Sequence, residues 1–153
     1  YVLDTGIVLG LIRGAGYAAY VRKKFNPSIP PNIAFLSIVT VAEMRALALR
    51  LVWGEQKRAA LDALLRSMPI VDIRHDSIVN VFASVDAFNH RKHPTHKLSG
   101  SSRAMGDNDI WIAATASIMK ATLLTADRDF DHLNGVFLDV VYIDQHLTEA
   151  DAK

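Results

Sequence analysis

The stretch that decides the fold is Met105–Asp131, which reads MGDNDIWIAATASIMKATLLTADRDFD. Its alanine-rich apolar face predicts a helix from about Asp107 to Lys120, and the apolar run after it predicts a strand at residues 122–125. Asp107 and Asp109 stand at the start of this helix, and Asp127 follows the strand. Helix N-termini and strand C-termini meet at one edge of an α/β sheet, where ligands collect. This stretch alone therefore brings several carboxylates to one edge.

Working outward, apolar runs alternate with helical patterns along the rest of the chain. We expect further strands at residues 1–3, 33–38, 70–73 and 136–143. We expect further helices at residues 5–12, 15–25, 40–53, 55–67 and 76–89, an irregular segment at 91–102 and a turn at 128–134. Alternating strands and helices predict an α/β fold with right-handed crossovers. The expected architecture is a three-layer α/β/α domain around a central, mostly parallel sheet of about five strands.

The composition is that of one ordinary globular domain. With 153 residues the chain can bury its own core, and we expect a domain at residues 1–144 followed by a frayed polar tail at 145–153. The formal net charge is +1, and the lack of cysteine excludes disulfides, thiolate nucleophiles and zinc ribbons. That lack fits a cytoplasmic location. No uncharged apolar run reaches the ~20 residues of a membrane-spanning helix. Because the chain begins at Tyr1 instead of methionine, we expect a few residues upstream.

Two more carboxylates are predicted at the same edge, and each acidic residue has a simpler structural explanation. Asp4, after the first strand, suits a helix N-cap. Thr40 and Glu43 have the spacing of a capping box. The dipole of its helix favours Asp109 in the first turn, and Asp127 suits a turn. For each of these residues taken alone, the pattern favours a structural role over a catalytic or metal-binding role.

The joint arrangement changes this balance. Two unit charges at about 4 Å repel by roughly 4 kcal/mol at an effective dielectric near 20. A tight cluster of four carboxylates would therefore take up a proton or a cation. Oxygen ligands without cysteine select a hard ion, so the expected cofactor is Mg²⁺ or Mn²⁺. Asp107 has a weaker claim on this site, because it suits the N-cap of its own helix.

Four short blocks carry a resemblance to a known family. They are Val2–Thr5 (VLDT), Ser37–Glu43 (SIVTVAE), Gly106–Ala114 (GDNDIWIAA) and Leu123–Phe130 (LLTADRDF). In this order they resemble the signature blocks of the PIN-domain ribonucleases, and most closely those of the VapC-type toxins of toxin–antitoxin pairs. The resemblance extends from Val2 to about Ile143.

The resemblance implies a metal-dependent endoribonuclease that hydrolyses RNA phosphodiester bonds and leaves a 3′-hydroxyl and a 5′-phosphate. The residues that match the family's catalytic and metal-binding positions are Asp4, Glu43, Asp109 and Asp127. The residues expected to hold these carboxylates in place, without contacting the metal themselves, are Thr125, Thr5 and Asp107. One position departs from the pattern: Gly6 stands where the family usually has asparagine, so a side-chain contact is missing.

The resemblance also implies partners. These are an RNA substrate such as tRNA or another structured RNA, a cognate antitoxin protein, and a second copy of the chain in a homodimer. A basic segment at residues 90–103 suits an RNA backbone, and a solvated surface loop explains it equally well. Its four cations are Arg91, Lys92, Lys97 and Arg103. His93 and His96 in the same segment are better explained as loop residues than as metal ligands.

The sequence also bears on three other functions. A PIN-like module that has lost catalysis and binds RNA or protein is the alternative that Gly6 favours. An aspartic protease is suggested by Leu3–Gly6 (LDTG), but that enzyme needs two such loops in an all-β fold, and here one copy is followed by helices. A haloacid-dehalogenase phosphatase needs a second aspartate at position 6, where this chain has glycine.

Overall fold

The computed structural model describes the whole chain from Tyr1 to Lys153 and contains five short strands. The strands are β1 (Val2–Leu3), β2 (Leu36–Ser37), β3 (Ile70–Val71), β4 (Leu123–Thr125) and β5 (Val140–Tyr142). The α-helices are α1 (Thr5–Arg13), α2 (Gly16–Phe25), α3 (Ile38–Arg50), α4 (Glu55–Arg66), α5 (Asp76–Asn89) and α6 (Asp107–Ile118). Two 3₁₀ helices, η1 (Arg128–Leu133) and η2 (Glu149–Asp151), complete the chain.

All strand pairs are parallel. β4 lies between β1 and β5, and β2 pairs with β3. A parallel bridge between Val2 and Phe35 joins the two groups. The resulting order, β3-β2-β1-β4-β5, confirms the expected parallel sheet of about five strands.

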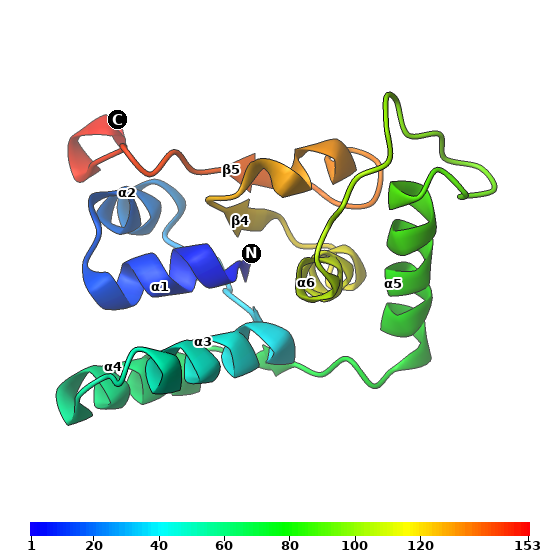
Figure 1. Ribbon diagram of the computed structural model, residues 1–153. Coiled ribbons are helices and arrows are strands. Elements are labelled where there is room, and N and C mark those ends of the chain that lie inside the picture. The colour runs from blue at the N-terminus through cyan, green and yellow to red at the C-terminus, as the bar shows by residue number, and fades with distance from the viewer.

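The sheet separates two hydrophobic cores. Leu3 and Leu124 contribute to the core under α1–α4, whereas their neighbours Val2 and Leu123 contribute to the core under α5 and α6. Successive strand residues point to opposite faces, so each buried strand is apolar on both sides. Figure 1 shows α5 and α6 on one side of the strands and α1 to α4 on the other. The three-layer α/β/α prediction is confirmed.

One predicted helix start, that of α3, and one predicted N-cap, Asp107, are wrong, whereas the predicted start of α6 near Asp107 is confirmed. α3 begins at Ile38 because Ser37 is its cap, with the Ser37 hydroxyl accepting from the amide of Val39 at 3.3 Å. Thr40 therefore lies inside the helix, where its buried hydroxyl has no partner, and the capping box with Glu43 does not form. In α6 the cap position belongs to Gly106, so Asp107 is the first helical residue and not the N-cap.

The C-terminal tail is ordered against α2, so the prediction of a frayed tail is wrong. The ammonium groups of Lys23 and Lys24 donate to the carbonyls of Glu149 (3.4 Å) and Lys153 (2.9 Å). A capping box between Thr148 and Asp151 starts η2. The basic end of α2 thus holds backbone carbonyls of the tail. The domain boundary at residue 144 stays a prediction.

The expected last strand is shorter than residues 136–143, since ladder pairing with β4 covers only Val140–Tyr142. Between α5 and α6 the chain forms neither helix nor strand, as expected. None of the helices is both long and apolar enough to span a membrane.

Candidate active site

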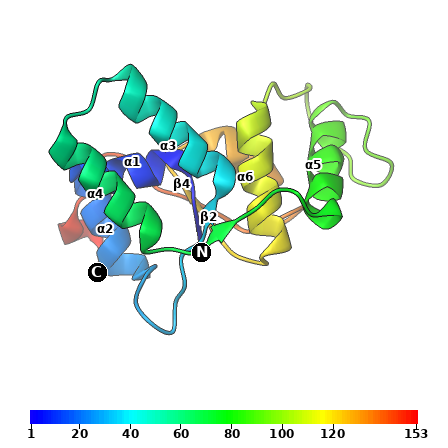
Figure 2. The same cartoon turned by 90° about the horizontal axis from the view of Figure 1, so that it is seen from below.

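The carboxyl ends of β1 and β4, together with α3 and the first turn of α6, form an acidic edge. β1 leads directly to Asp4, and β4 ends at Thr125, two residues before Asp127. Figure 2 shows β1 running into α1 at the same end of the molecule as the start of α6. The acidic edge is defined here as Asp4, Glu43, Asp109, Asp127 and Asp129.

Asp4 is the buried anchor of the acidic edge, with 6% of its surface exposed. Its Oδ1 accepts from the amide of Thr5 at 2.6 Å, and its Oδ2 accepts from the Thr125 hydroxyl at 2.8 Å. The Thr125 hydroxyl accepts in turn from the amide of Asp127 at 3.0 Å. Asp4 therefore caps α1, as the structural explanation required, and also links the two central strands. Burial is the main reason that the pKa of Asp4 is raised, followed by the opposing effect of these hydrogen bonds and by repulsion from Glu43 and Asp127.

Glu43 is held by two donors. The Thr5 hydroxyl donates to its Oε2, and the amide of Asn108 donates to its Oε1 at 2.7 Å. These bonds tie α3 to the starts of α1 and α6. Asn108 was not predicted as a site residue, although its place between Asp107 and Asp109 in the first turn of α6 could have identified it.

Asp109 is half-buried, and no hydrogen bond stabilises its charged form. Burial raises its pKa to about 6, and repulsion from Asp4, Glu43, Asp127 and Asp129 adds to the effect. Its Oδ2 would lie 3.3 Å from a Cβ at position 106, so Gly106 gives the carboxylate room. The structure thus brings the charges of all four predicted catalytic carboxylates close enough to act on one another.

The other acidic residues lie at the margin. Asp127 is exposed, and its Oδ1 accepts from the amide of Asp129 at 2.8 Å, so it also acts as the turn residue that starts η1. Asp107 is exposed, and no hydrogen bond joins it to the acidic edge. Thr5 and Thr125 do hold carboxylates of the acidic edge, whereas Asp107 does not.

The donor chemistry of the acidic edge fits a hard divalent cation, because every donor is an oxygen, and burial together with repulsion between the carboxylates raises the pKa values of Asp4 and Asp109. The side chains do not form a closed ligand cage, since no three of them are near enough to enclose an ion. The residues that would hold a cation are the four carboxylates with mutual repulsion, Asp4, Glu43, Asp109 and Asp127.

The four cations of the basic segment are all exposed: Arg91, Lys92, Lys97 and Arg103. His93 accepts from the amides of Thr95 (3.2 Å) and His96 (2.9 Å), which fits a loop residue. Both tryptophans lie in packed surroundings. Trp53 is 5% exposed, and Trp111 stacks on Phe82 with ring centroids 4.1 Å apart. Both side chains therefore contribute to packing.

Comparisons with known structures agree with this fold. The chain is similar to a chain of VapBC2 from Rickettsia felis bound to a DNA fragment from their promoter (TM-score 0.76, 21% identity, 94% of this chain and 98% of that one). It is similar to a chain of VapBC-1 from nontypeable Haemophilus influenzae (0.70, 22%, 93% and 96%). A third is VapBC-5 from Mycobacterium tuberculosis, of the VapBC family of toxin-antitoxin systems (0.59, 23%, 93% and 97%). At these identities the likeness concerns the fold.

Comparisons by sequence give the family. A search of curated proteins found no match. The family model of the PIN domain matches residues 1–136, which include β1 to β4, η1 and the whole acidic edge. On this match, and on a fold shared with the VapBC chains, the chain belongs to the PIN-domain family.

Proposed function

We propose that the chain is a metal-dependent endoribonuclease that hydrolyses RNA phosphodiester bonds. The observation that carries this proposal is Asp109, a half-buried carboxyl whose pKa is raised to about 6 beside four other carboxylates. Such clustering of charge is unfavourable for folding alone and is characteristic of functional sites. The proposed cofactor is Mg²⁺ or Mn²⁺, held by the carboxylates of Asp4, Glu43, Asp109 and Asp127.

The chain's own residues would prepare this site in three ways. Thr125 and the amide of Thr5 orient Asp4, so that its buried carboxylate stays in one position. Thr5 and Asn108 fix the two oxygens of Glu43. Asp109 has no donor of its own and is free to turn toward a cation. When bound there, a divalent ion supplies Lewis-acid chemistry, lowering the pKa of water and offsetting charge that develops on the phosphate.

We further propose that the chain is a VapC-type toxin with a cognate antitoxin and a homodimeric form, acting in the cytoplasm on a structured RNA such as tRNA. The support is the fold shared with chains of VapBC assemblies, together with the four sequence blocks. Exposed apolar side chains offer surface for such partners, Leu49 being 74% and Val52 85% exposed at the end of α3.

A catalytically inactive PIN-like module that binds RNA or protein is the second candidate, and Gly6 is the observation that favours it. A Cβ at position 6 would lie 3.6 Å from the Asp4 Oδ2, an ordinary contact, so a side chain would fit there. Its absence removes a group beside a catalytic carboxylate without disturbing the backbone. The Gly6 carbonyl accepts from the Tyr17 hydroxyl at 2.9 Å.

The test is cleavage of a pool of structured RNAs by the purified protein. We expect cutting with Mn²⁺ and none with EDTA, and we expect the products to carry 5′-phosphates. RNA binding without cutting, with either Mg²⁺ or Mn²⁺, would favour the inactive module. The cut sites would also identify the substrate class.

A further inference from the structure

Asn89, the last residue of α5, joins three segments beside the acidic edge. It is a buried polar residue with 1% exposure. Its Oδ1 lies 2.6 Å from the Nε2 of His132 on η1, and since an amide oxygen only accepts, this nitrogen carries the hydrogen. Its Nδ2 donates to the Met105 sulfur at 3.6 Å. The main-chain carbonyl of Asn89 accepts from the main-chain amide of Arg103 at 3.0 Å. Asn89 thus fixes the end of the basic segment.

Arg103 is the one cation of that segment that lines the small cavity beside η1. Its amide donates to the main-chain carbonyl of Asn89, and His132, which stacks parallel to Phe88 with centroids 6.1 Å apart, donates to the side chain of the same residue. None of the four ion pairs in the structure uses Arg103, so its guanidinium is available to a ligand. A guanidinium without an ion-pair partner suits the bidentate recognition of a phosphate.

A small cavity lies between this anchored segment and η1. Its volume is about 230 Å³. Its lining consists of Ser101, Ser102, Arg103, Ala104, Met105 and Asp129. The cavity is smaller than the roughly 300–1,000 Å³ of typical ligand pockets, which suits one sugar–phosphate unit better than a whole nucleotide.

The cavity adjoins the acidic edge through Asp129. This carboxylate lines the cavity, and its charge also acts on Asp109. A site for an anion alone would not include a carboxylate. A carboxylate only accepts hydrogen bonds, and the sugar hydroxyl that distinguishes RNA from DNA, the 2′-hydroxyl, is a donor.

We propose that this cavity binds the ribose-phosphate unit next to the cleaved bond, with Arg103 binding the phosphate and Asp129 accepting from the 2′-hydroxyl. Asn89 and His132 are positioning residues that hold Arg103 in place. This inference rests on the proposed function and deepens it, because it makes the cavity the part of the site that selects RNA over DNA.

The test compares binding of a single-stranded RNA and a DNA of the same sequence, by fluorescence anisotropy in EDTA so that nothing is cut. We expect the protein to prefer RNA by about tenfold, the typical value of one hydrogen bond to a charged group. Asp129→Asn should reduce this preference to about twofold or less, whereas the control Asp131→Asn on the same η1 helix should retain it. The ratio cancels the general effect of removing a negative charge.

The positioning role is tested on the same RNA. Arg103→Ala and His132→Phe should each weaken binding by a similar factor, and the double variant should be no weaker than either. His132→Phe keeps the stacking on Phe88 and removes the donor to Asn89 together with the bond between the ring and the backbone of Asp129. Lys97→Ala, the matched control, should add its own effect to that of His132→Phe.

Equal binding of RNA and DNA by the unmodified protein, an unchanged ratio in Asp129→Asn, or additive effects of Arg103→Ala and His132→Phe would each overturn the inference. These failures are distinct from failure of the proposed function. Metal-dependent cleavage without RNA preference would overturn the inference alone. RNA preference with no cleavage by the unmodified protein would contradict the nuclease and leave the ribonucleotide site standing.

Discussion

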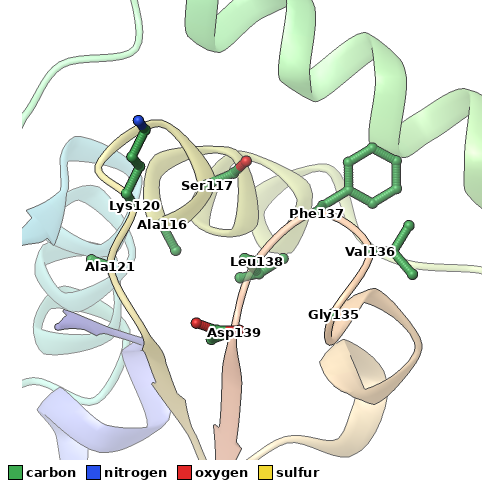
Figure 3. Close-up of a pocket in the computed structure, with 9 residues that line it drawn as sticks. All are labelled: Ala116, Ser117, Lys120, Ala121, Gly135, Val136, Phe137, Leu138 and Asp139. Atoms are coloured by element: carbon green, nitrogen blue, oxygen red, sulfur yellow. The ribbon is translucent and has the colours of Figure 1, made fainter.

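The two edges of the sheet differ sharply, although β4 and α6 contribute to both. At the amino edge a cavity of about 270 Å³ lies between the end of α6 and the turn before β5. Figure 3 shows Lys120 and Ser117 on the α6 side of that cavity and Asp139 across from them. That edge has one cation and one carboxylate on opposite sides of the cavity, whereas the acidic edge gathers five carboxylates. The cavity at the amino edge is larger than the one beside the acidic edge, but it holds less charge. Cavity size alone would therefore place the functional site at the amino edge, away from the clustered carboxylates.

The largest expected effect concerns catalysis. Asp109→Asn should reduce RNA cleavage by at least about 10²-fold, because even residues that only support metal ligands contribute 10–100-fold. Asp139→Asn, the matched change at the amino edge, should leave cleavage within about twofold of normal. Initial rates on one RNA with Mn²⁺ measure both. Equal losses in the two variants would remove the distinction between the edges.

The next effect concerns stability. Thr125→Val keeps the shape of a fully buried side chain but removes the donor to Asp4, which should lower the free energy of unfolding by about 1–3 kcal/mol. Ser117→Ala at the amino edge should change it by less than about 0.5 kcal/mol. Urea unfolding measures both variants. A neutral Thr125→Val would show that the carboxylate does not depend on this bond.

The third effect depends on pH. Because folding raises the pKa of Asp109 from 3.8 to about 6, the folded protein gains stability from the protonated form, and this gain is lost as the pH rises through 6. Asp109→Asn mimics the protonated form. In EDTA it should raise the Tm by at least about 2 °C at pH 8 and change it little at about pH 3.5, below the unfolded pKa. A difference in Tm that is the same at both pH values would contradict mutual repulsion at the acidic edge.

The smallest effect concerns Gly6. The Tyr17 ring and hydroxyl already hold this turn of α1, and the ring fits because Gly10 has no side chain: a Cβ there would lie 2.5 Å from ring carbons. Gly6→Asn should therefore fold normally and gain a few tenths of a kcal/mol from helix propensity. It should raise cleavage about two- to fivefold by adding a donor beside Asp4. A loss of activity would show that position 6 must stay open.

The sheet and most of the acidic edge could be predicted because both depend on local pattern. The apolar run before Thr125 predicts β4, and the alanine-rich face predicts α6. Each pattern lies within one short segment of the sequence. A parallel topology then places Asp4 and Asp127 at one edge, whereas the order of the strands was seen only in the structure. The roles of Thr5 and Thr125 followed from position in the blocks, although their partners were visible only in three dimensions.

What could not be predicted depends on contacts between distant segments. Thr40 matched a capping box, but the strand before it ends at Ser37, which takes the cap first. The polar composition of residues 145–153 predicted a frayed tail. The basic end of α2 instead binds carbonyls of this tail, more than 120 residues away in the sequence. Asn89 is an ordinary amide in the sequence and acquires its role only when η1 is brought beside it.

The most direct test of the account is a Mn²⁺ titration followed by electron paramagnetic resonance, in which bound ions lose the signal of free Mn²⁺. We expect saturable binding at pH 7.5 to the unmodified protein and to Asp139→Asn, and loss of this binding in Asp109→Asn. We also expect weaker binding below pH 6, where protons compete for Asp109. Equal binding by Asp109→Asn, or no saturable binding by the unmodified protein, would contradict a metal site at the acidic edge.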